Sequence, residues 1–281
     1  MKPPTVPQPV NVALLREPFP SGGEWLFGME KPLTDLSGKS VWVTGASSGI
    51  GEAIAEAFCA AGARVAISAR RADALRRVQE AFSTLRGEVA SFPLDVSEAE
   101  AVAEAAKHIR ANWGGIDILV NCAGINVKKR HWRDLDIADW HRMIAINLNG
   151  VANTVTAALP LMRAQKDGLI VNISSWAAQH EFAVAGPAYI ASKRGVIELS
   201  HSINREEMQH NIRCCCICPA EVATPILEQR PVPVSEEDAE RMLQPADLAE
   251  LVTFVAAAPS RVCFNEIVIS PTYNRTLLPQ P

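Results

Sequence analysis

The stretch SVWVTGASSGIGEAIAEAFCAAGA, residues 40–63, decides the fold of this chain. It begins as a short apolar run typical of a buried strand. After a glycine turn it continues as an apolar-periodic helix with a glycine near its end. The same alternation recurs along the chain, which implies a parallel sheet with helices on both faces. We therefore expect an α/β fold with one doubly wound parallel sheet of the Rossmann type.

Further strands and helices are predicted to alternate along the rest of the chain. Strands are expected at 64–69, 89–96, 117–124, 168–175, 212–220 and 266–270, and helices at 72–85, 98–113, 138–163 and 246–257, with one more around residues 189–193. The strand runs are almost continuously apolar, as strands buried on both faces are. No internal repeat or change of composition follows residue 38, so we expect residues 38–281 to form one domain.

The first 37 residues differ from the rest and are predicted to form a proline-rich extended arm. Six prolines lie among the first twenty residues, and proline blocks helices and disfavours interior strands. The arm lacks the apolar run of a signal peptide. The chain has seven cysteines, and an odd number without a secretion signal indicates reduced thiols and a cytoplasmic location.

The overall composition argues against several classes of protein. A formal net charge of −4 is unlike a nucleic-acid-binding surface, and no apolar run approaches the roughly 18 residues of a membrane span, so neither partner is expected. The CCCIC run at 214–218 does not predict a metal site, because no C-x-x-C pair or ligand-spaced histidine accompanies it. Strand alternation should put Cys214, Cys216 and Cys218 on one face and Cys215 on the other, as small apolar groups.

The turn TGASSGIG, residues 44–51, lies between the first strand and the first helix. In a doubly wound fold this turn is at the carboxyl edge of the sheet, where ligands bind. Glycines let the backbone approach a ligand closely, and the free N–H groups of the helix start favour a phosphate. The spacing differs from the G-x-G-x-x-G fingerprint, but its place in the first βαβ unit favours nucleotide binding over a plain glycine turn. The residues expected to contact the nucleotide here are Gly45, Ser47, Ser48, Gly49, Ile50 and Gly51.

The end of the second predicted strand indicates which nucleotide binds. An acidic residue there would bond a ribose 2′-hydroxyl, whereas an arginine accommodates a 2′-phosphate. Ala69 stands where the acid would be, and Arg70 and Arg71 follow it. Two guanidinium groups can grip a phosphate, although the same pair could simply be surface arginines at a helix start. We therefore predict NADP(H) as the cofactor in preference to NAD(H).

The sequence AYIASKRG, residues 188–195, places a tyrosine four positions before a lysine. Positions i and i+4 share one face of a helix, so the tips of Tyr189 and Lys193 can meet at one point. A phenol beside an ammonium ion releases its proton more easily, because positive charge favours phenolate. Taken alone, such a pair is more often a core tyrosine and a surface lysine than a catalytic pair.

Together with further motifs, these stretches resemble the short-chain dehydrogenase/reductase family over residues 38–270. The further motifs occur in the family's order, as LDV at 94–96, NCAG at 121–124, INLNG at 146–150, IVNISS at 170–175 and CPAEVATP at 218–225. Ala220 departs from the pattern, because glycine is usual there. Ser175 lies fourteen positions before Tyr189, one more than typical, which leaves Ser174 as an alternative. Ser175 is preferred because it ends the strand and faces the site.

The resemblance implies a catalytic set and a wider cofactor site. The catalytic residues would be Asn147, Ser175, Tyr189 and Lys193. Beyond the glycine turn and the two arginines, the cofactor would contact Asp95, Val96, Asn121, Ala123, Gly124, Tyr189, Lys193, Pro219, Val222 and Thr224. In this scheme Tyr189 exchanges a proton with the substrate oxygen, which Ser175 holds, while Lys193 also binds the nicotinamide ribose. Asn147 completes a proton path to solvent through a bound water.

The resemblance therefore predicts that residues 38–281 are a dinucleotide-binding and catalytic domain. This domain would transfer a hydride between NADP(H) and a secondary alcohol or ketone. By analogy with the family, a homodimer or homotetramer acting on a small molecule is expected. Two alternatives stay open. One is an NADP(H)-binding sensor or scaffold without turnover. The other is a 3-oxoacyl-carrier-protein reductase, for which the KKR run at 128–130 is the only basic docking candidate. Residues 230–242, with two prolines, fall where the family has its substrate lid and suggest a modest one.

Overall fold

The structure is a computed structural model that describes residues 35–180, 183–231 and 233–277. The predicted N-terminal arm, residues 1–37, lies outside the described residues except for its last three, so that assignment stays a prediction. Within those three, Leu36 is buried in the core, and its N–H donates to the Ala61 carbonyl at 2.9 Å.

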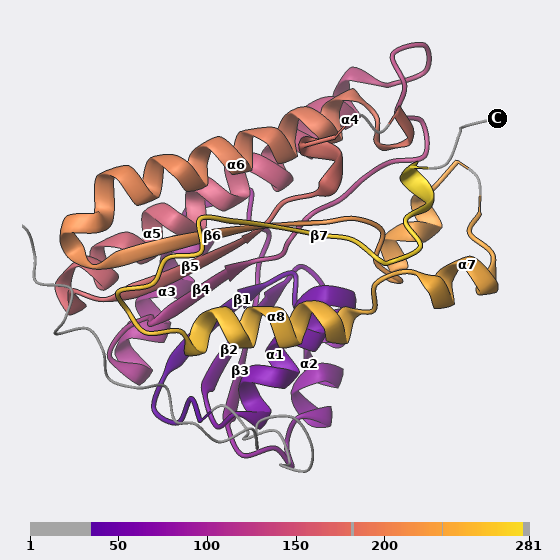
Figure 1. Cartoon of the computed structure of the whole chain (residues 1–281). Coiled ribbons are helices and arrows are strands. Elements are labelled where there is room, and N and C mark those ends of the chain that lie inside the picture. The colour runs from indigo at the N-terminus through magenta and orange to yellow at the C-terminus, as the bar shows by residue number, and fades with distance from the viewer. Residues whose placement is uncertain (1–34, 181–182, 232, 278–281) are drawn as a thin grey trace, which may run out of the picture. The chain divides into compact units, whose positions relative to one another are not determined.

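Within the described residues, seven parallel strands form one sheet in the order β3-β2-β1-β4-β5-β6-β7 (Figure 1). The strands are β1 (Ser40–Thr44), β2 (Arg64–Ala69), β3 (Glu88–Pro93), β4 (Ile118–Asn121), β5 (Gly168–Ile173), β6 (Ile212–Pro219) and β7 (Glu266–Ile269). The order reverses between β1 and β4, and open α/β sheets bind ligands at the carboxyl ends beside such a switch. The predicted doubly wound parallel sheet is confirmed.

Helices cover both faces of the sheet, as the alternating pattern predicts (Figure 1). One face carries α1 (Gly49–Ala60), α2 (Ala72–Ala81) and α8 (Pro245–Ala257). The other carries α3 (Ala99–Trp113), α5 (Gly150–Gln165) and α6 (Pro187–Glu207). The short helix α4 (Ile137–Ile144) packs on α6. The segment predicted to form a lid contains another short helix, α7 (Glu236–Arg241).

Strand β1 shows how one alternating strand supplies both cores. Val41 and Val43 are fully buried and pack with the apolar side chains of α1 and α8. Trp42, also fully buried, points to the opposite face and packs among α3, α5 and α6. Its indole N–H donates to the Ser68 hydroxyl at 2.9 Å, so the buried polar atom is satisfied. Burying each of these valine side chains stabilises the folded state by about 1.5–3 kcal/mol relative to leaving it exposed.

Strand β6 repeats this alternation with cysteines. Cys214, Cys216 and Cys218 belong to the core of Trp42, while Cys215 faces the core of Val41, so the predicted division between faces is confirmed. Burial raises the pKa of the Cys215 thiol to about 12, and burial also raises that of Cys214. The thiols of Cys214 and Cys215 therefore stay neutral and pack as small apolar groups.

The helix predicted at 138–163 is interrupted. A π-helical turn at Ala145–Asn149 separates α4 from α5, and the Gly150 N–H donates to the Ala145 carbonyl five residues earlier. The run 137–165 is also long and apolar enough to cross a membrane by length and composition, contrary to the expectation that no apolar run approaches the length of a membrane span. Its buried side chains, such as Val155 and Met162, pack in the core with α3, so the run serves as a core helix.

Candidate active site

The glycine turn after β1 borders a cavity at the carboxyl edge of the sheet. Gly45 and Gly49 have φ values of 68° and 60°, in the left-handed region that other residues rarely adopt. A Cβ on Gly45 would come within 2.7 Å of the Ala123 nitrogen, and a Cβ on Gly51 would overlap the Gly45 carbonyl oxygen. Glycine is therefore required here by backbone shape and by the close packing of the turn against the loop after β4.

The start of α1 leaves backbone donors at this turn. Its N-cap, Ser48, makes no side-chain hydrogen bond to the helix. Free N–H groups at a helix start favour an anion. Arg77 of α2 holds the turn from outside. Its guanidinium bonds the Glu52 carboxylate at 2.9 and 3.1 Å and the Ser47 carbonyl at 3.1 Å. The sequence did not single out Arg77, because nothing in the α2 pattern marks which arginine reaches across.

Most of the predicted cofactor residues line this cavity. They are Gly45, Ser47, Ser48, Gly49, Ile50, Gly51, Arg70, Arg71, Asp95, Val96, Ala123, Gly124 and Thr224. Arg70 and Arg71 are exposed at the end of β2, beside Ala69. One Asp95 carboxylate oxygen accepts hydrogen bonds from the N–H and hydroxyl of Ser97, at 2.9 and 2.7 Å, which fixes the loop after β3.

Asn121 was predicted to contact the cofactor, but its side chain is buried inside the sheet. Its amide nitrogen donates to the Asn172 side-chain oxygen at 2.9 Å, and its oxygen accepts from the Thr154 hydroxyl at 2.6 Å. This chain of polar groups links β4, β5 and α5 beneath the cavity. Asn121 therefore supports the floor of the cavity rather than lining it.

A second cavity adjoins the first and contains the predicted catalytic side chains of Ser175, Tyr189 and Lys193, whereas Asn147 is fully buried and lines neither cavity. The two cavities have in common the lining residues Ile50, Cys122, Gly124, Thr224 and Ile226. Ser174, Ser175, Tyr189, Lys193, Pro219 and Val222 line the second cavity. The two together form one cleft along the carboxyl ends of β1, β4, β5 and β6, at the switch point of the sheet.

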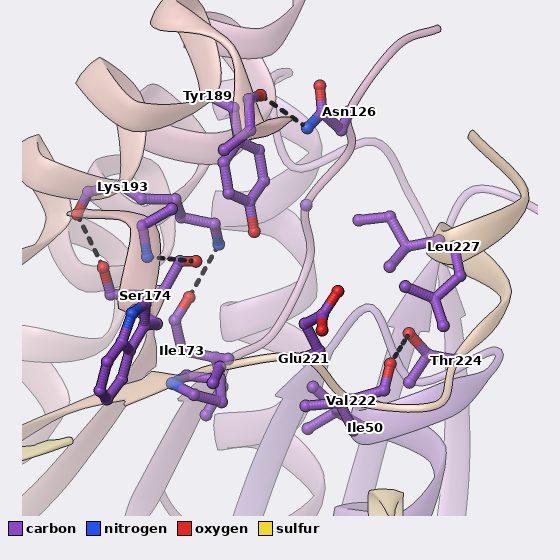
Figure 2. Close-up of a pocket in the computed structure, with 18 of the residues that line it drawn as sticks. Ile50, Asn126, Ile173, Ser174, Tyr189, Lys193, Glu221, Val222, Thr224 and Leu227 are labelled. Atoms are coloured by element: carbon purple, nitrogen blue, oxygen red, sulfur yellow. Dashed lines mark hydrogen bonds between the residues drawn. The ribbon is translucent and has the colours of Figure 1, made fainter. Parts of the chain in front are cut away.

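Helix α6 brings Tyr189 and Lys193 to this cleft. Gly186, with a φ of 80°, precedes Pro187, and proline is preorganised for the first helical position. The Lys193 ammonium lies 5.8 Å from the centre of the Tyr189 ring and donates to the Ile173 carbonyl at 2.8 Å. Figure 2 shows the Tyr189 hydroxyl and the Lys193 ammonium turned toward the same space. The i, i+4 spacing has thus placed both polar tips on one cavity.

The two serines after β5 have different partners. The Ser174 hydroxyl donates to the Lys193 carbonyl at 2.8 Å, so it ties β5 to α6 (Figure 2). The Ser175 hydroxyl accepts from the Ala177 N–H at 3.2 Å, an arrangement that leaves its own proton for another acceptor. This difference favours Ser175 as the serine that can bond a substrate oxygen.

Asn147 lies in the π turn and is fully buried. Its side-chain oxygen accepts from the Ile125 N–H at 2.8 Å, and its nitrogen donates to the Ile125 carbonyl at 3.0 Å and the Ser192 hydroxyl at 3.2 Å. It also borders Gly124, where a Cβ would come within 3.5 Å of its oxygen and 3.3 Å of the Lys193 nitrogen. Asn147 and Lys193 therefore meet around one glycine.

The far wall of the second cavity carries charged residues that the motifs did not identify. Glu221, only 4% exposed at its side chain, pairs with Arg230 and, at 2.7 Å, with Arg275, which also pairs with Asp238 of α7. We call Glu221, Arg230, Asp238 and Arg275 the Glu221 cluster. Arg130, part of the KKR run that is the candidate basic docking surface, is 4% exposed and also lines this cavity. The KKR run does not show which of its three basic residues is buried, and its two lysines are exposed.

Comparisons with known proteins agree with this geometry. The family model for short chain dehydrogenases matches residues 39–232. An uncharacterized oxidoreductase of Staphylococcus aureus (strain MW2) is 33% identical over 239 residues, covering 85% of this chain and all of that protein. A metagenomic short-chain oxidoreductase solved in complex with NADP is 34% identical, with a TM-score of 0.73 over 84% of this chain and 98% of the other. The closed form of a serine dehydrogenase complexed with NADP+ is 30% identical, with a TM-score of 0.74 over 83% of this chain and 94% of the other.

The chain belongs to the short-chain dehydrogenase family and is an oxidoreductase of that family. The predicted resemblance is thereby confirmed, and members of this family act on small molecules.

Proposed function

We propose that this protein transfers a hydride between NADP(H) and a secondary alcohol or ketone, with Tyr189 as the general acid and base. The single observation that carries the proposal is the shared cleft. The cavity of Tyr189 and Lys193 adjoins the glycine-turn cavity through five common lining residues. A nucleotide in one cavity and a small alcohol in the other would come into contact where the two cavities join.

The residues of the first cavity fit a dinucleotide phosphate. The uncapped start of α1 offers donors to a pyrophosphate, and the glycines leave space for its close approach. Arg70 and Arg71 stand where a ribose 2′-phosphate needs positive charge, and Ala69 offers no acid to repel it. Two similar solved structures, the metagenomic oxidoreductase and the serine dehydrogenase, hold NADP or NADP+, which further supports NADP(H) here.

In the proposed reaction the bound nicotinamide supplies the hydride acceptor or donor, and the chain's own groups manage the alcohol oxygen. In the oxidative direction, Tyr189 takes the hydroxyl proton while the carbinol hydrogen leaves with its electron pair. In the reverse direction, Tyr189 returns that proton to the developing alkoxide. Lys193 places its ammonium 5.8 Å from the centre of the Tyr189 ring, on the same cavity.

Ser175 and Asn147 receive supporting roles in this proposal. Ser175 donates its hydroxyl proton to the substrate oxygen and holds that oxygen near Tyr189. Asn147 is a positioning residue, because both polar atoms of its amide bond the Ile125 backbone beside Lys193. Pro219 and Val222 line the substrate side of the cleft, and Thr224 lines both sides.

The alternatives gain less support. A sensor without turnover has no need for a tyrosine and lysine directed into an adjoining cavity. A carrier-protein reductase would need a basic surface, but only Lys128 and Lys129 of the KKR run are exposed. We also infer that the enzyme works in the cytoplasm as a homo-oligomer, in keeping with its family.

Replacing Tyr189 by phenylalanine tests the proposed chemistry. The Tyr189→Phe variant keeps the ring and loses the proton, so kcat for ketone reduction is expected to fall about 10²–10⁴-fold. NADPH binding, followed by its fluorescence, should stay within about twofold. The matched control is Tyr273→Phe, which alters the chain's other tyrosine, 47% exposed. Parent-level turnover by Tyr189→Phe would contradict the assigned role.

A further inference from the structure

Arg130 is a buried cation at the wall of the substrate cavity. The residue is 4% exposed and lines the cavity that also contains Tyr189 and Ser175. Within the described part of the chain, no carboxylate forms an ion pair with it. Leaving a buried charge without a partner of opposite sign costs several kcal/mol. Such a residue at a cavity wall indicates a ligand that carries the missing charge.

The hydrogen bonds of Arg130 fix its orientation without neutralising it. Its Nε donates to the Val127 carbonyl at 2.5 Å, and its two terminal nitrogens donate to the carbonyls of Val184, at 3.4 Å, and of Gln229. A guanidinium has five N–H donors, and these three acceptors are all neutral. Two N–H groups of the fork therefore remain for another acceptor.

Arg130 lies in a cavity wall where cations outnumber carboxylates. Burial, followed by the charge of Arg230, lowers the pKa of Arg130 to about 10, so it stays positive at neutral pH. Arg230 is itself held by Glu221, which Arg275 also engages. Among the described residues that line the cavity, Glu221 is thus the only carboxylate, set against Arg130, Lys193 and Arg230.

Arg130 is also close to the reacting groups. An ionised Tyr189 favours the charged form of Arg130, so the two groups interact electrostatically. The Arg130 backbone packs on Gly186, where a Cβ would come within 2.9 Å of the Arg130 Cβ, directly before α6. A ligand bonded to Arg130 would therefore lie near the phenol.

We propose that the substrate carries a carboxylate that binds the Arg130 fork, so that the enzyme acts on short hydroxy acids and the corresponding oxo acids. This inference rests on the proposed hydride transfer and names its substrate class. Within the described residues each terminal nitrogen of Arg130 keeps one N–H without an acceptor, and arginine favours bidentate bonding of a carboxylate. Arg230 adds positive charge to the same cavity, and Tyr189 also lines it, so a short acid fits between Arg130 and the phenol.

The test compares each acid with its own neutral ester in the unaltered enzyme. Short 2-, 3- and 4-oxo acids and their methyl esters are offered with NADPH, and oxidation is followed by absorbance. We expect kcat/KM to be at least 100-fold higher for the best acid than for its ester. Equal rates for the two, or a preference for neutral ketones, would overturn the carboxylate while leaving hydride transfer intact. A preference for phosphate esters over carboxylates would overturn it as well.

Variants then assign the effect to Arg130. Arg130→Met should lower kcat/KM for the acid about 100-fold and leave that for the ester within about threefold, with NADPH binding retained. Arg130→Lys should recover part of the loss. The control is Arg133→Met, in the same loop but exposed. Equal losses for acid and ester would overturn the assignment. If no compound is turned over, the melting temperature of the protein is measured with the same oxo acids. A rise in melting temperature that Arg130→Met abolishes supports carboxylate binding at Arg130 and counts against the proposed hydride transfer. No rise with any acid overturns carboxylate binding at Arg130.

Discussion

Arg70 and Arg71 are the residues on which the proposed cofactor preference depends. Both are exposed at the end of β2 and line the nucleotide cavity. Charge-assisted hydrogen bonds contribute about 1.5–3 kcal/mol each, and 1.4 kcal/mol corresponds to a tenfold change in affinity.

Replacing both arginines by alanine should therefore weaken NADPH binding by about 10–100-fold and change NADH binding little. Titration of each variant with both cofactors, followed by cofactor fluorescence, measures the two constants. Arg76→Ala, which alters an exposed arginine on the following helix α2, serves as the control. Equal losses for NADPH and NADH would count against a phosphate-binding role.

Residues in ordered motifs could be predicted from the sequence, and residues defined by distant contacts could not. Tyr189 and Lys193 follow from helical spacing, and the glycines follow from a turn that tolerates no side chain. Ser174 and Ser175 are adjacent and identical, so only their partners separate them. Arg130 bonds to Gln229, a residue 99 positions away, and no local pattern encodes such a contact.

Among the elements, the long helix 138–163 shows where pattern reading fails. Strands and most helices agree with expectation because their apolar periods are regular. The π turn at Ala145–Asn149 inserts an extra residue into the helix, as π turns often do at functional sites. The apolar stripe of α4 is thereby shifted in phase from that of α5, and the Gly150 that follows the turn does not by itself distinguish a π turn from a continuous helix.

The ends of α5 and α6 are joined by an ion pair that makes stability depend on pH. Glu207, 5% exposed at its side chain, accepts from the Arg163 guanidinium, with one bond of 2.8 Å. The hydrogen bond from Arg163 lowers the pKa of Glu207 below its usual value. Because the pKa of Glu207 is lower in the folded state, the ion pair stabilises the fold fully at pH values above the unfolded-state pKa of about 4.3. This stabilisation is lost as the pH falls through the folded-state pKa.

Glu207→Gln should therefore lower the free energy of unfolding at pH 7 by an amount on the order of 1 kcal/mol. The difference from the parent should shrink as the pH drops below about 4. Urea unfolding at several pH values measures both, with Glu206→Gln, exposed at the neighbouring position, as the control. A difference that stays constant down to acid pH would contradict the pairing.

For the whole molecule, the order of the strands assembles the cleft. Gly45 follows β1, Gly124 follows β4, Ser175 follows β5 and Val222 follows β6. Parallel strands end at the same edge, so segments far apart in sequence meet there. This is why the fold and most residues that line the glycine-turn cavity could be predicted, whereas the wall of the second cavity, built from loop residues such as Arg130 and Glu221, could not.

Because the cofactor cavity spans this edge, a bound nucleotide should stabilise the whole fold. At about 100 times its Kd, NADP+ would add about 2.7 kcal/mol, which raises the Tm by about 5–10 °C for a chain of this size. NAD+ at the same concentration should give a smaller rise. Differential scanning fluorimetry measures both shifts, and equal shifts for the two nucleotides would argue against the NADP(H) preference.

The Glu221 cluster constrains how the substrate side of this molecule can be re-engineered. Its four charges come from the turn after β6, the loop before α7, α7 itself and the segment after β7, and they pair with one another around the buried Glu221. Grafting any one of these segments from a homologue would leave unmatched ions in the wall. Chimeras intended to change specificity should therefore exchange positions 221, 230, 238 and 275 as a set.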